Sequence, residues 1–339
     1  MDNLIFTLNA ILPIILCIVI GYVVKLLKIF PEDFFPKLNK LCFRLLLPVL
    51  LFKNIYDIEN ITKMADYWKI ILFSALTIIG FFFIGLIIVI FFIKDEKQKG
   101  VILQCIFRSN YAIIGIGLIE LLASNYNNND MQMAIGVGAI LSAISIPIFN
   151  ILAIIALSIF VKEEGKKVSA KDVLVKICKN PLIIAVLLGI VFLLIRIAIP
   201  LDEYGNKVFS IKNDLKFLYT TIKWLAQCAS PIALIALGGA FSFSAVSKLK
   251  YKIILGTTIR VIFVPFIAIT LAFIFKFDKI YFPALIALFG TPVAVSSVPM
   301  AQELGNDSEL AGQLVVWTTI SSAFTLFIII LISSSIGLL

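Results

Sequence analysis

The chain has 339 residues, of which 61% are hydrophobic and 14% are charged, and its mean hydropathy is +1.09. One soluble core cannot bury so much apolar surface, so the composition excludes a soluble globular protein and indicates a polytopic membrane protein. The net charge of +9 does not indicate a nucleic-acid partner, because the lysines lie mainly in short loops rather than on one basic face.

Ten runs of the sequence are apolar enough to cross a membrane as helices, each of which needs about 20 residues. In chain order they cover residues 4–27, 34–56, 68–93, 100–122, 132–160, 181–199, 217–242, 253–275, 281–302 and 310–336. The polar segment 161–180 is too short for an independent core. We therefore expect a cytoplasmic linker at 161–180 between two five-helix halves, residues 1–160 and 181–339.

Lysines are unevenly distributed between the loops. The loops after the first, third, fifth and seventh runs are rich in lysine, whereas "ASNYNNND" at 123–130, after the fourth run, contains neither Lys nor Arg. The acidic loop "ELGNDSEL" after the ninth run is the exception among the odd-numbered runs. By the positive-inside rule the lysine-rich loops are cytoplasmic, so both termini are expected to be extracytoplasmic. The first run lacks a basic leading region and a cleavage site, so we expect a retained span rather than a signal peptide.

The two halves share internal features. Pro13 precedes Gly21 by eight residues in the first run, and Pro181 precedes Gly189 by eight residues in the sixth. The second and seventh runs each contain a central proline. Five helices therefore repeat as five, and an odd number of spans forces the repeats into opposite topology, which is typical of secondary transporters.

Polar residues and prolines interrupt the fourth and ninth runs. The fourth contains "FRSNYAIIGIGL" (107–118), and the ninth contains "GTPVAVSSVPM" (290–300), with Asn110 corresponding to Pro292. Thr291 followed by Pro292 predicts a helix start, with a hydroxyl N-cap and proline at the first helical position. Ser109 or Asn110 is the expected cap of the other restart. Non-helical backbone in a membrane must be buried in protein or line a cavity, so the two breaks predict one shared internal site.

Two helix N-termini at such a site would favour an anion. The candidate substrate-binding residues are Arg108, Ser109, Asn110, Tyr111, Ser142, Thr291, Pro292, Ser296 and Ser297. For the serines, the alternative is that small residues allow close helix packing. For Arg108, two interpretations stay open, since its side chain either snorkels to the cytoplasmic surface or approaches a substrate carboxylate. From the sequence alone, Asn110 ranks above Arg108 in its contribution to affinity.

Four segments, "FRSNYAIIGIGL", "LLPVLLF", "SPIALIALGGAFS" and "TPVAVSSVPMAQELGND", resemble the bacterial auxin efflux carrier family, which includes malonate and malate carriers. The resemblance implies an all-α fold of ten transmembrane helices in two inverted repeats, with broken helices 4 and 9 crossing at the midplane. It also implies an elevator mechanism, with a scaffold of helices 1, 2, 6 and 7 and a transport domain of helices 3–5 and 8–10. Plant relatives carry a proline at the fourth-helix break, whereas this chain has "SNYA", which argues against assuming auxin as substrate.

We therefore expect a secondary transporter of a small organic anion in the cell membrane, in contact with lipid. The coupling ion, H+ or Na+, stays open, as does a homodimer through the scaffold helices. A sodium-coupled symporter of the bile-acid type is the nearer alternative, and a membrane sensor or channel the more distant one. The sequence has no histidine, no Walker loop and no cluster of metal ligands, so we expect no enzyme, no cofactor and no metal.

Overall fold

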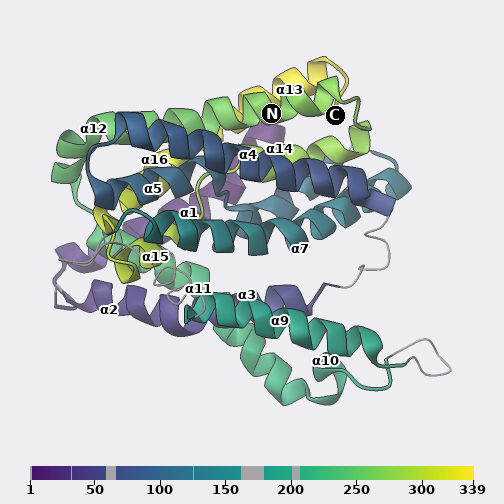
Figure 1. The fold of residues 1–339 in the computed structure, drawn as a ribbon, viewed down its shortest axis with the longest axis horizontal. Coiled ribbons are helices and arrows are strands. Elements are labelled where there is room, and N and C mark those ends of the chain that lie inside the picture. The colour runs from purple at the N-terminus through teal and green to yellow at the C-terminus, as the bar shows by residue number, and fades with distance from the viewer. Residues whose placement is uncertain (1, 32, 59–65, 125, 162–178, 201–206) are drawn as a thin grey trace.

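A computed structural model describes residues 2–31, 33–58, 66–124, 126–161, 179–200 and 207–339, and this part of the chain is helical, without β-strands (Figure 1). The first half contains α1 (Asp2–Leu26), α2 (Phe34–Leu41), η1 (Cys42–Leu46), α3 (Leu47–Tyr56), α4 (Trp68–Phe92), α5 (Glu96–Phe107), η3 (Tyr111–Gly115), α6 (Ile116–Leu122) and α7 (Asn128–Ser158). The second half contains α9 (Pro181–Ala198), α10 (Ile211–Asp214), α11 (Lys216–Ala240), α12 (Phe243–Thr258), η4 (Ile259–Phe263), α13 (Val264–Ile274), η5 (Lys279–Tyr281), α14 (Phe282–Gly290), α15 (Ser297–Glu303) and α16 (Ser308–Ser335). Most of the expected linker, residues 162–178, lies outside the described residues.

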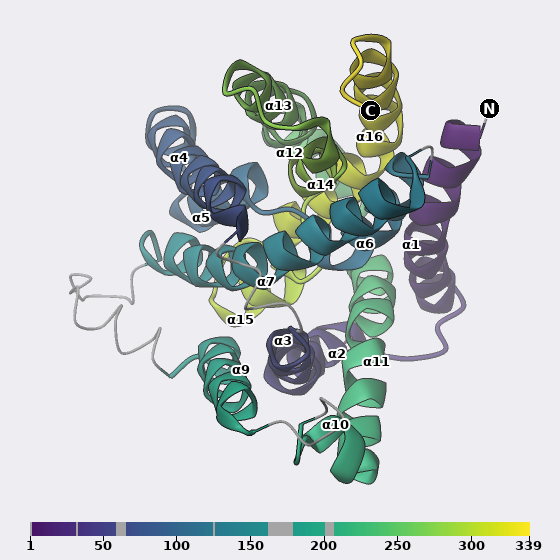
Figure 2. The same ribbon diagram turned by 90° about the vertical axis from the view of Figure 1, so that its right-hand side faces the viewer.

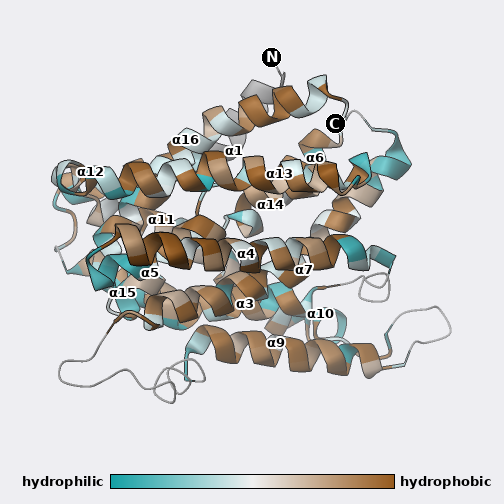
Figure 3. Cartoon of the chain, turned by 45° about the horizontal axis from the view of Figure 1, so that its top comes forward, coloured by the Kyte–Doolittle hydropathy of each residue, from teal (hydrophilic) through white to brown (hydrophobic). Residues whose placement is uncertain are grey.

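Six helical segments of the described chain are long and apolar enough to cross a membrane: Trp68–Phe92, Asn128–Ser158, Pro181–Ala198, Lys216–Ala240, Phe243–Ile274 and Ser308–Ser335. Their ribbons are largely brown in Figure 3, which marks hydrophobic residues. Phe91 of α4 is 79% exposed and Phe324 of α16 is 69% exposed. Apolar side chains at such exposure need lipid around them, so the chain is an integral membrane protein.

Four of the expected spans are divided by changes in backbone geometry. The π-helical segment η1 separates α2 from α3, and Pro48, which has no amide hydrogen to donate, follows it by two residues. The π-helical segment η4 precedes Pro265 in the same way within the longer helix formed by α12 and α13. Proline removes one hydrogen bond of the helix ladder, which favours such local widening. The other two divided spans contain the breaks after α5 and α14.

The helices form two groups. Helices α2, α3, α9 and α11 lie together on the lower side of Figures 1 and 2, with α1 against α11. A Cβ atom on Gly21 of α1 would stand 2.1 Å from the carbonyl oxygen of Ile235, and one on Gly238 would meet the backbone of α1 at 1.9 Å. A Cβ on Gly189 of α9 would meet the side chain of Ile55 of α3 at 2.9 Å. Only glycine permits these close approaches, which are typical of helix packing in membranes.

Candidate functional site

The two helix breaks lie side by side. The chain is non-helical at residues 108–110, between α5 and η3, and it has no α-helical structure at 291–296, between α14 and α15. The backbone N–H of Asn110 donates a hydrogen bond of 2.7 Å to the carbonyl oxygen of Pro292. The structure thus brings together two segments separated by about 180 residues of sequence, and we call residues 108–110 and 291–296 the junction.

The second half-helix begins later than the sequence predicts. Thr291 is the C-cap of α14, and α15 starts at Ser297 with Ser296 as its N-cap, so the prediction that Thr291 and Pro292 start this helix was wrong. The backbone at the predicted start binds other elements instead. The carbonyl of Thr291 accepts hydrogen bonds from Arg260, and the N–H of Val293 donates to the hydroxyl of a threonine in α16.

The start of α15 also offers fewer free donors than expected. The N–H groups of Ser297 and Val298 donate to the carbonyls of Ala294 and Val295, at 3.0 and 3.2 Å. The next residue, Pro299, has no amide hydrogen. The amides of this first turn are therefore engaged within the chain, and a bound anion needs another source of positive charge.

A cavity of about 60 Å³ adjoins the junction. Its walls come from α3, α7, α9 and α11 as well as from both breaks. The polar residues that line it are Asn54, Arg108, Ser109, Asn110, Asn150, Ser230 and Ser296. This volume accommodates a few water-sized groups, which matches the polar head of a small ligand.

Arg108 supplies a full positive charge to this cavity. Its side chain is only 3% exposed, so the interpretation that it snorkels to the surface was wrong. One terminal nitrogen, Nη2, donates to Asn150 Oδ1 at 2.8 Å and to Ser296 Oγ at 2.7 Å. The other, Nη1, lies 2.8 Å from Met300 Sδ and 3.5 Å from Gln104 Oε1. All four acceptors are neutral.

None of the ion pairs formed by the described residues includes Arg108. A buried charge is costly unless it is paired, so its position at a cavity wall is characteristic of a binding site. Next to it, Ser109 Oγ is buried and has no hydrogen-bond partner among the described residues. Buried polar atoms are nearly always paired in folded proteins, so this hydroxyl is also available to a ligand.

Several residues predicted for the site lie beside the cavity rather than on its wall. The hydroxyl of Tyr111 donates to the carbonyl of Gly138 at 3.0 Å, which joins the first break to α7. Thr291 and Ser297 are buried, and neither lines the cavity. Ser142 lines a neighbouring pocket of about 320 Å³, which we call the vestibule pocket.

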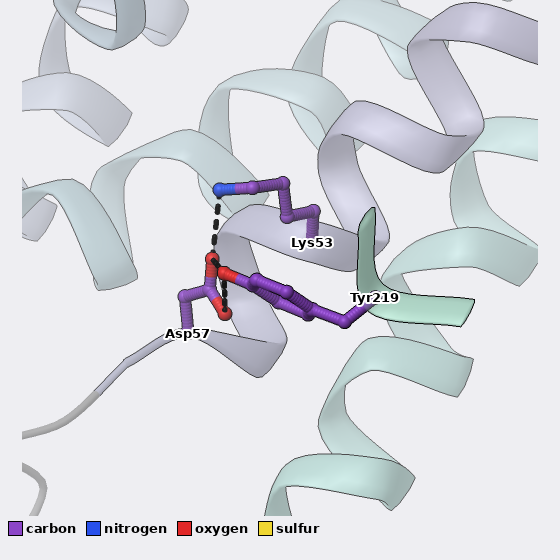
Figure 4. Close-up of polar contacts among 3 residues, drawn as sticks. All are labelled: Lys53, Asp57 and Tyr219. Carbon is purple, nitrogen blue, oxygen red and sulfur yellow. Dashed lines mark hydrogen bonds and ion pairs between the residues drawn. The ribbon is translucent and has the colours of Figure 1, made fainter. Parts of the chain in front are cut away.

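The vestibule pocket adjoins the cavity, since Asn54, Ala112 and Ile146 line both. An ion pair on its wall joins Lys53 Nζ to Asp57 Oδ2 at 2.7 Å (Figure 4). The hydroxyl of Tyr219 in α11 donates to the same carboxylate at 3.0 and 3.1 Å. A pocket with a paired lysine on its wall therefore lies next to the cavity.

The sequence analysis missed three polar residues of the cavity wall: Asn54, Asn150 and Ser230. Asn150 had a usable signal, because it is an isolated amide within the long apolar run 132–160, where a polar side chain is costly. Its side-chain nitrogen donates to the carbonyl of Ile146 at 2.8 Å, which orients its oxygen toward Arg108. The sequence contained no comparable signal for the other two.

A second buried arginine lies beside the junction and does not line the cavity. Arg260, in η4, has no exposed surface, and its guanidinium donates only to backbone carbonyls. Its Nε and Nη2 donate to the carbonyl of Thr291 at 3.1 and 2.8 Å. Nη2 also donates to Phe289 at 3.0 Å, and Nη1 donates to Ile106 at 3.2 Å. Arg260 therefore pairs with backbone carbonyls inside the fold.

Comparison with known proteins gives two findings. A family model described as "Membrane transport protein" matches residues 6–330. The "Uncharacterized transporter YfdV" of Escherichia coli K12 is 26% identical over 196 residues, or 58% of this chain, and the proteins of the same name in Escherichia coli O157:H7 and Shigella flexneri match equally well. The matched region spans 60% of the length of these relatives.

Proposed function

Because the chain belongs to the membrane transport protein family of auxin efflux carriers, and is a transporter rather than an enzyme, we propose that it carries a small organic anion through the junction. The observation that carries this proposal is Arg108, a buried charge on the wall of a polar cavity whose contacts are all with neutral groups. A carboxylate is the natural partner of a guanidinium, because two parallel N–H groups match its two oxygens.

The neighbours of Arg108 define how the anion would be held. Asn150 and Ser296 accept from the same nitrogen of Arg108, which fixes the plane of the guanidinium. Ser109 and Asn110 line the same cavity and would serve as additional donors. Charge-assisted hydrogen bonds of this kind are about twice as strong as neutral ones. We assign Arg108 to the substrate carboxylate, and Ser109 and Asn110 to its free oxygen.

The cavity size bears on the substrate class. About 60 Å³ accepts a carboxylate head, and the rest of the substrate would extend into the vestibule pocket of about 320 Å³. Ser142 and Lys53 line that pocket. This arrangement suits a short dicarboxylate, and the resemblance to malonate and malate carriers favours the same class.

For the architecture we infer ten transmembrane spans in two inverted repeats, 1–160 and 181–339. Support comes from glycine contacts: Gly21 of the first span packs on the seventh, and Gly189 of the sixth packs on the second. Exchange of the two repeats converts one contact into the other, as inverted symmetry requires. On this model helices 4 and 9 cross at the midplane, where the hydrogen bond between Asn110 and Pro292 joins them.

We further infer an elevator mechanism. Spans 1, 2, 6 and 7, which correspond to α1, α2–α3, α9 and α11, would form the scaffold, and the other spans would move the substrate. In support, the cavity lies between these groups, with Asn54 and Ser230 on one side and the junction on the other. A homodimer would pair through the scaffold, whose helix α9 exposes Leu187 and Leu194.

Lysine distribution supports a topology with both termini outside the cytoplasm. Cysteines introduced at Ser124 and Ser169 should then react with an impermeant thiol reagent from opposite sides of the membrane, the first from outside. Labelling of both positions from one side would contradict the ten-span arrangement. Ser169 belongs to the expected linker and lies outside the described residues.

The bile-acid-type symporter remains the second candidate. For such a symporter, Ser109, Asn110 and Gln302 are the residues that could supply oxygen ligands to sodium. Ser109 and Asn110 lie at the junction, but Gln302 does not line the cavity. Gln302 donates to the carbonyl of Pro36 at 2.9 Å and accepts from Asn39 at 3.1 Å, so its side chain links α15 to α2. These contacts favour a carrier without that sodium site.

Uptake into proteoliposomes tests the proposed function. Labelled mono- and dicarboxylates should be presented one at a time, with sodium and pH gradients imposed separately. We expect saturable uptake of at least one short dicarboxylate, which a proton gradient or counter-substrate drives. Ohmic current without saturation would favour a channel, and no uptake of any carboxylate would contradict the proposal.

A further inference from the structure

Arg260 gathers the carboxyl ends of both broken helices around one guanidinium. Ile106 is in the last turn of α5, and Phe289 and Thr291 stand at the end of α14. All three carbonyls belong to residues at helix ends, where the helix itself supplies no donor. The partial negative charge of a helix C-terminus adds to the dipole of each carbonyl. The three carbonyls therefore form a cage with the chemistry of a monovalent cation site.

Unwound carbonyls and half-helix C-terminal ends are the groups that hold coupling cations in secondary transporters with broken helices. In this chain a side chain occupies that position. The guanidinium is fully buried, and none of the ion pairs among the described residues includes it, so the carbonyl cage alone offsets its charge. Four hydrogen bonds of 2.8 to 3.2 Å use most of its five N–H groups.

We infer that Arg260 is a built-in cation, which fills a carbonyl cation site at the junction and makes anion transport independent of sodium and potassium. This inference rests on the proposed function, and it adds that the Arg260 side chain takes the place of a coupling cation. Because Arg260 binds carbonyls beside both breaks and does not line the cavity, its permanent charge would keep the junction assembled while the substrate carboxylate binds and leaves.

The first test uses the unaltered protein in proteoliposomes. Uptake of labelled malonate and malate should be measured with sodium, potassium or choline as the external cation at constant ionic strength and pH. We expect equal rates in all three. Uptake that requires sodium or potassium would overturn the inference, although it would leave the proposed transport of an organic anion intact. Absence of uptake would instead contradict the proposed function.

The second test opens the cage. Arg260→Ala should lower uptake by about tenfold or more, and guanidinium at millimolar, non-denaturing concentrations should restore part of it and raise the melting temperature of the purified variant. Arg260→Met keeps the length of the side chain without its charge, so it should remain inactive and should respond to no cation. Arg196→Ala is the matched control, since Arg196 in α9 is not part of the cage.

Two results of this second test would contradict the inference. If Arg260→Met transports like the unaltered protein, Arg260 contributes packing rather than charge. If the melting temperature of Arg260→Ala is the same in choline, sodium and guanidinium, the carbonyls do not form a cation site. Should Arg260→Ala fail to fold, Arg260→Lys provides the readout, because a lysine ammonium keeps the charge and should retain partial uptake.

Discussion

Arg108 and Arg260 are both buried beside the same two helix breaks, but their surroundings differ in kind. Backbone carbonyls at helix ends accept hydrogen bonds from all three guanidinium nitrogens of Arg260, and none of its surface is exposed. Arg108 contacts neutral side chains and lines a cavity. The carbonyls and helix dipoles around Arg260 compensate its positive charge. The charge of Arg108 is left for a bound anion to compensate.

This difference separates structure from function at the junction. A cation whose donors are mostly used by backbone carbonyls stabilises the fold and has little to offer a ligand. A buried cation that contacts only neutral acceptors lowers the folding stability of the empty protein, and a bound anion restores that stability. We therefore expect substitutions at the two positions to alter different measured quantities, folding stability for Arg260 and substrate affinity for Arg108.

The largest effect is expected from removing Arg260. Arg260→Leu leaves three buried carbonyls without a donor, and each such group costs about 1–3 kcal/mol. The variant should therefore lose much of its thermal stability in detergent, measured by fluorescence-detected size exclusion after heating. Arg108→Leu is the matched control, because it removes the same chemical group from the cavity wall. Equal melting temperatures for the two variants would contradict the comparison.

The second effect concerns affinity. Arg108→Gln keeps a polar side chain and removes the charge, so substrate affinity should fall by about 10- to 150-fold, which corresponds to about 1.5–3 kcal/mol for a hydrogen bond to a charged group. The empty protein should melt at the same temperature or higher, because an unpaired buried charge has been removed. Scintillation-proximity binding and melting curves on one preparation give both values. A large loss of stability without loss of affinity would place Arg108 with Arg260.

A smaller effect is expected at Asn110. The contact that joins the breaks uses its backbone N–H, which Asn110→Leu preserves, so this substitution removes only a neutral side-chain donor. Affinity should fall by about 3- to 10-fold. The sequence alone ranks Asn110 above Arg108, and the contacts of the two side chains reverse this ranking. Binding measured side by side decides, since a greater loss for Asn110→Leu would restore the ranking from the sequence.

The smallest effect is expected at Ser296. Its hydroxyl accepts from Arg108 at 2.7 Å, so Ser296→Ala removes one neutral acceptor and frees that N–H for the substrate. Affinity should change by no more than about threefold. Ser297→Ala serves as the control, because this neighbouring hydroxyl does not line the cavity. A loss at Ser296 as large as at Arg108 would indicate that the serine itself binds the anion.

Much of the fold could be predicted from the sequence, because hydropathy and proline positions are local signals. The described helices follow the ten apolar runs, and both breaks occur where polar residues or proline interrupt those runs. The start of α15 could not be predicted, since Thr291 has a good capping sequence but its carbonyl is held by Arg260, 31 residues away. The role of Arg108 was also open from the sequence, because its closest contacts are with residues distant along the chain. Its acceptor Asn150 is 42 residues distant, and only the tertiary structure brings the two together.

The most direct test of the account compares a carboxylate with its neutral isostere. Binding of malonate and of malonamide should be measured by calorimetry on the unaltered protein and on Arg108→Gln. The account predicts that the unaltered protein binds malonate more tightly than malonamide by about 10-fold or more, and that Arg108→Gln loses this preference, because the charge-assisted hydrogen bonds are gone. A preference for malonate that survives in Arg108→Gln would contradict the assignment of Arg108 to the substrate carboxylate.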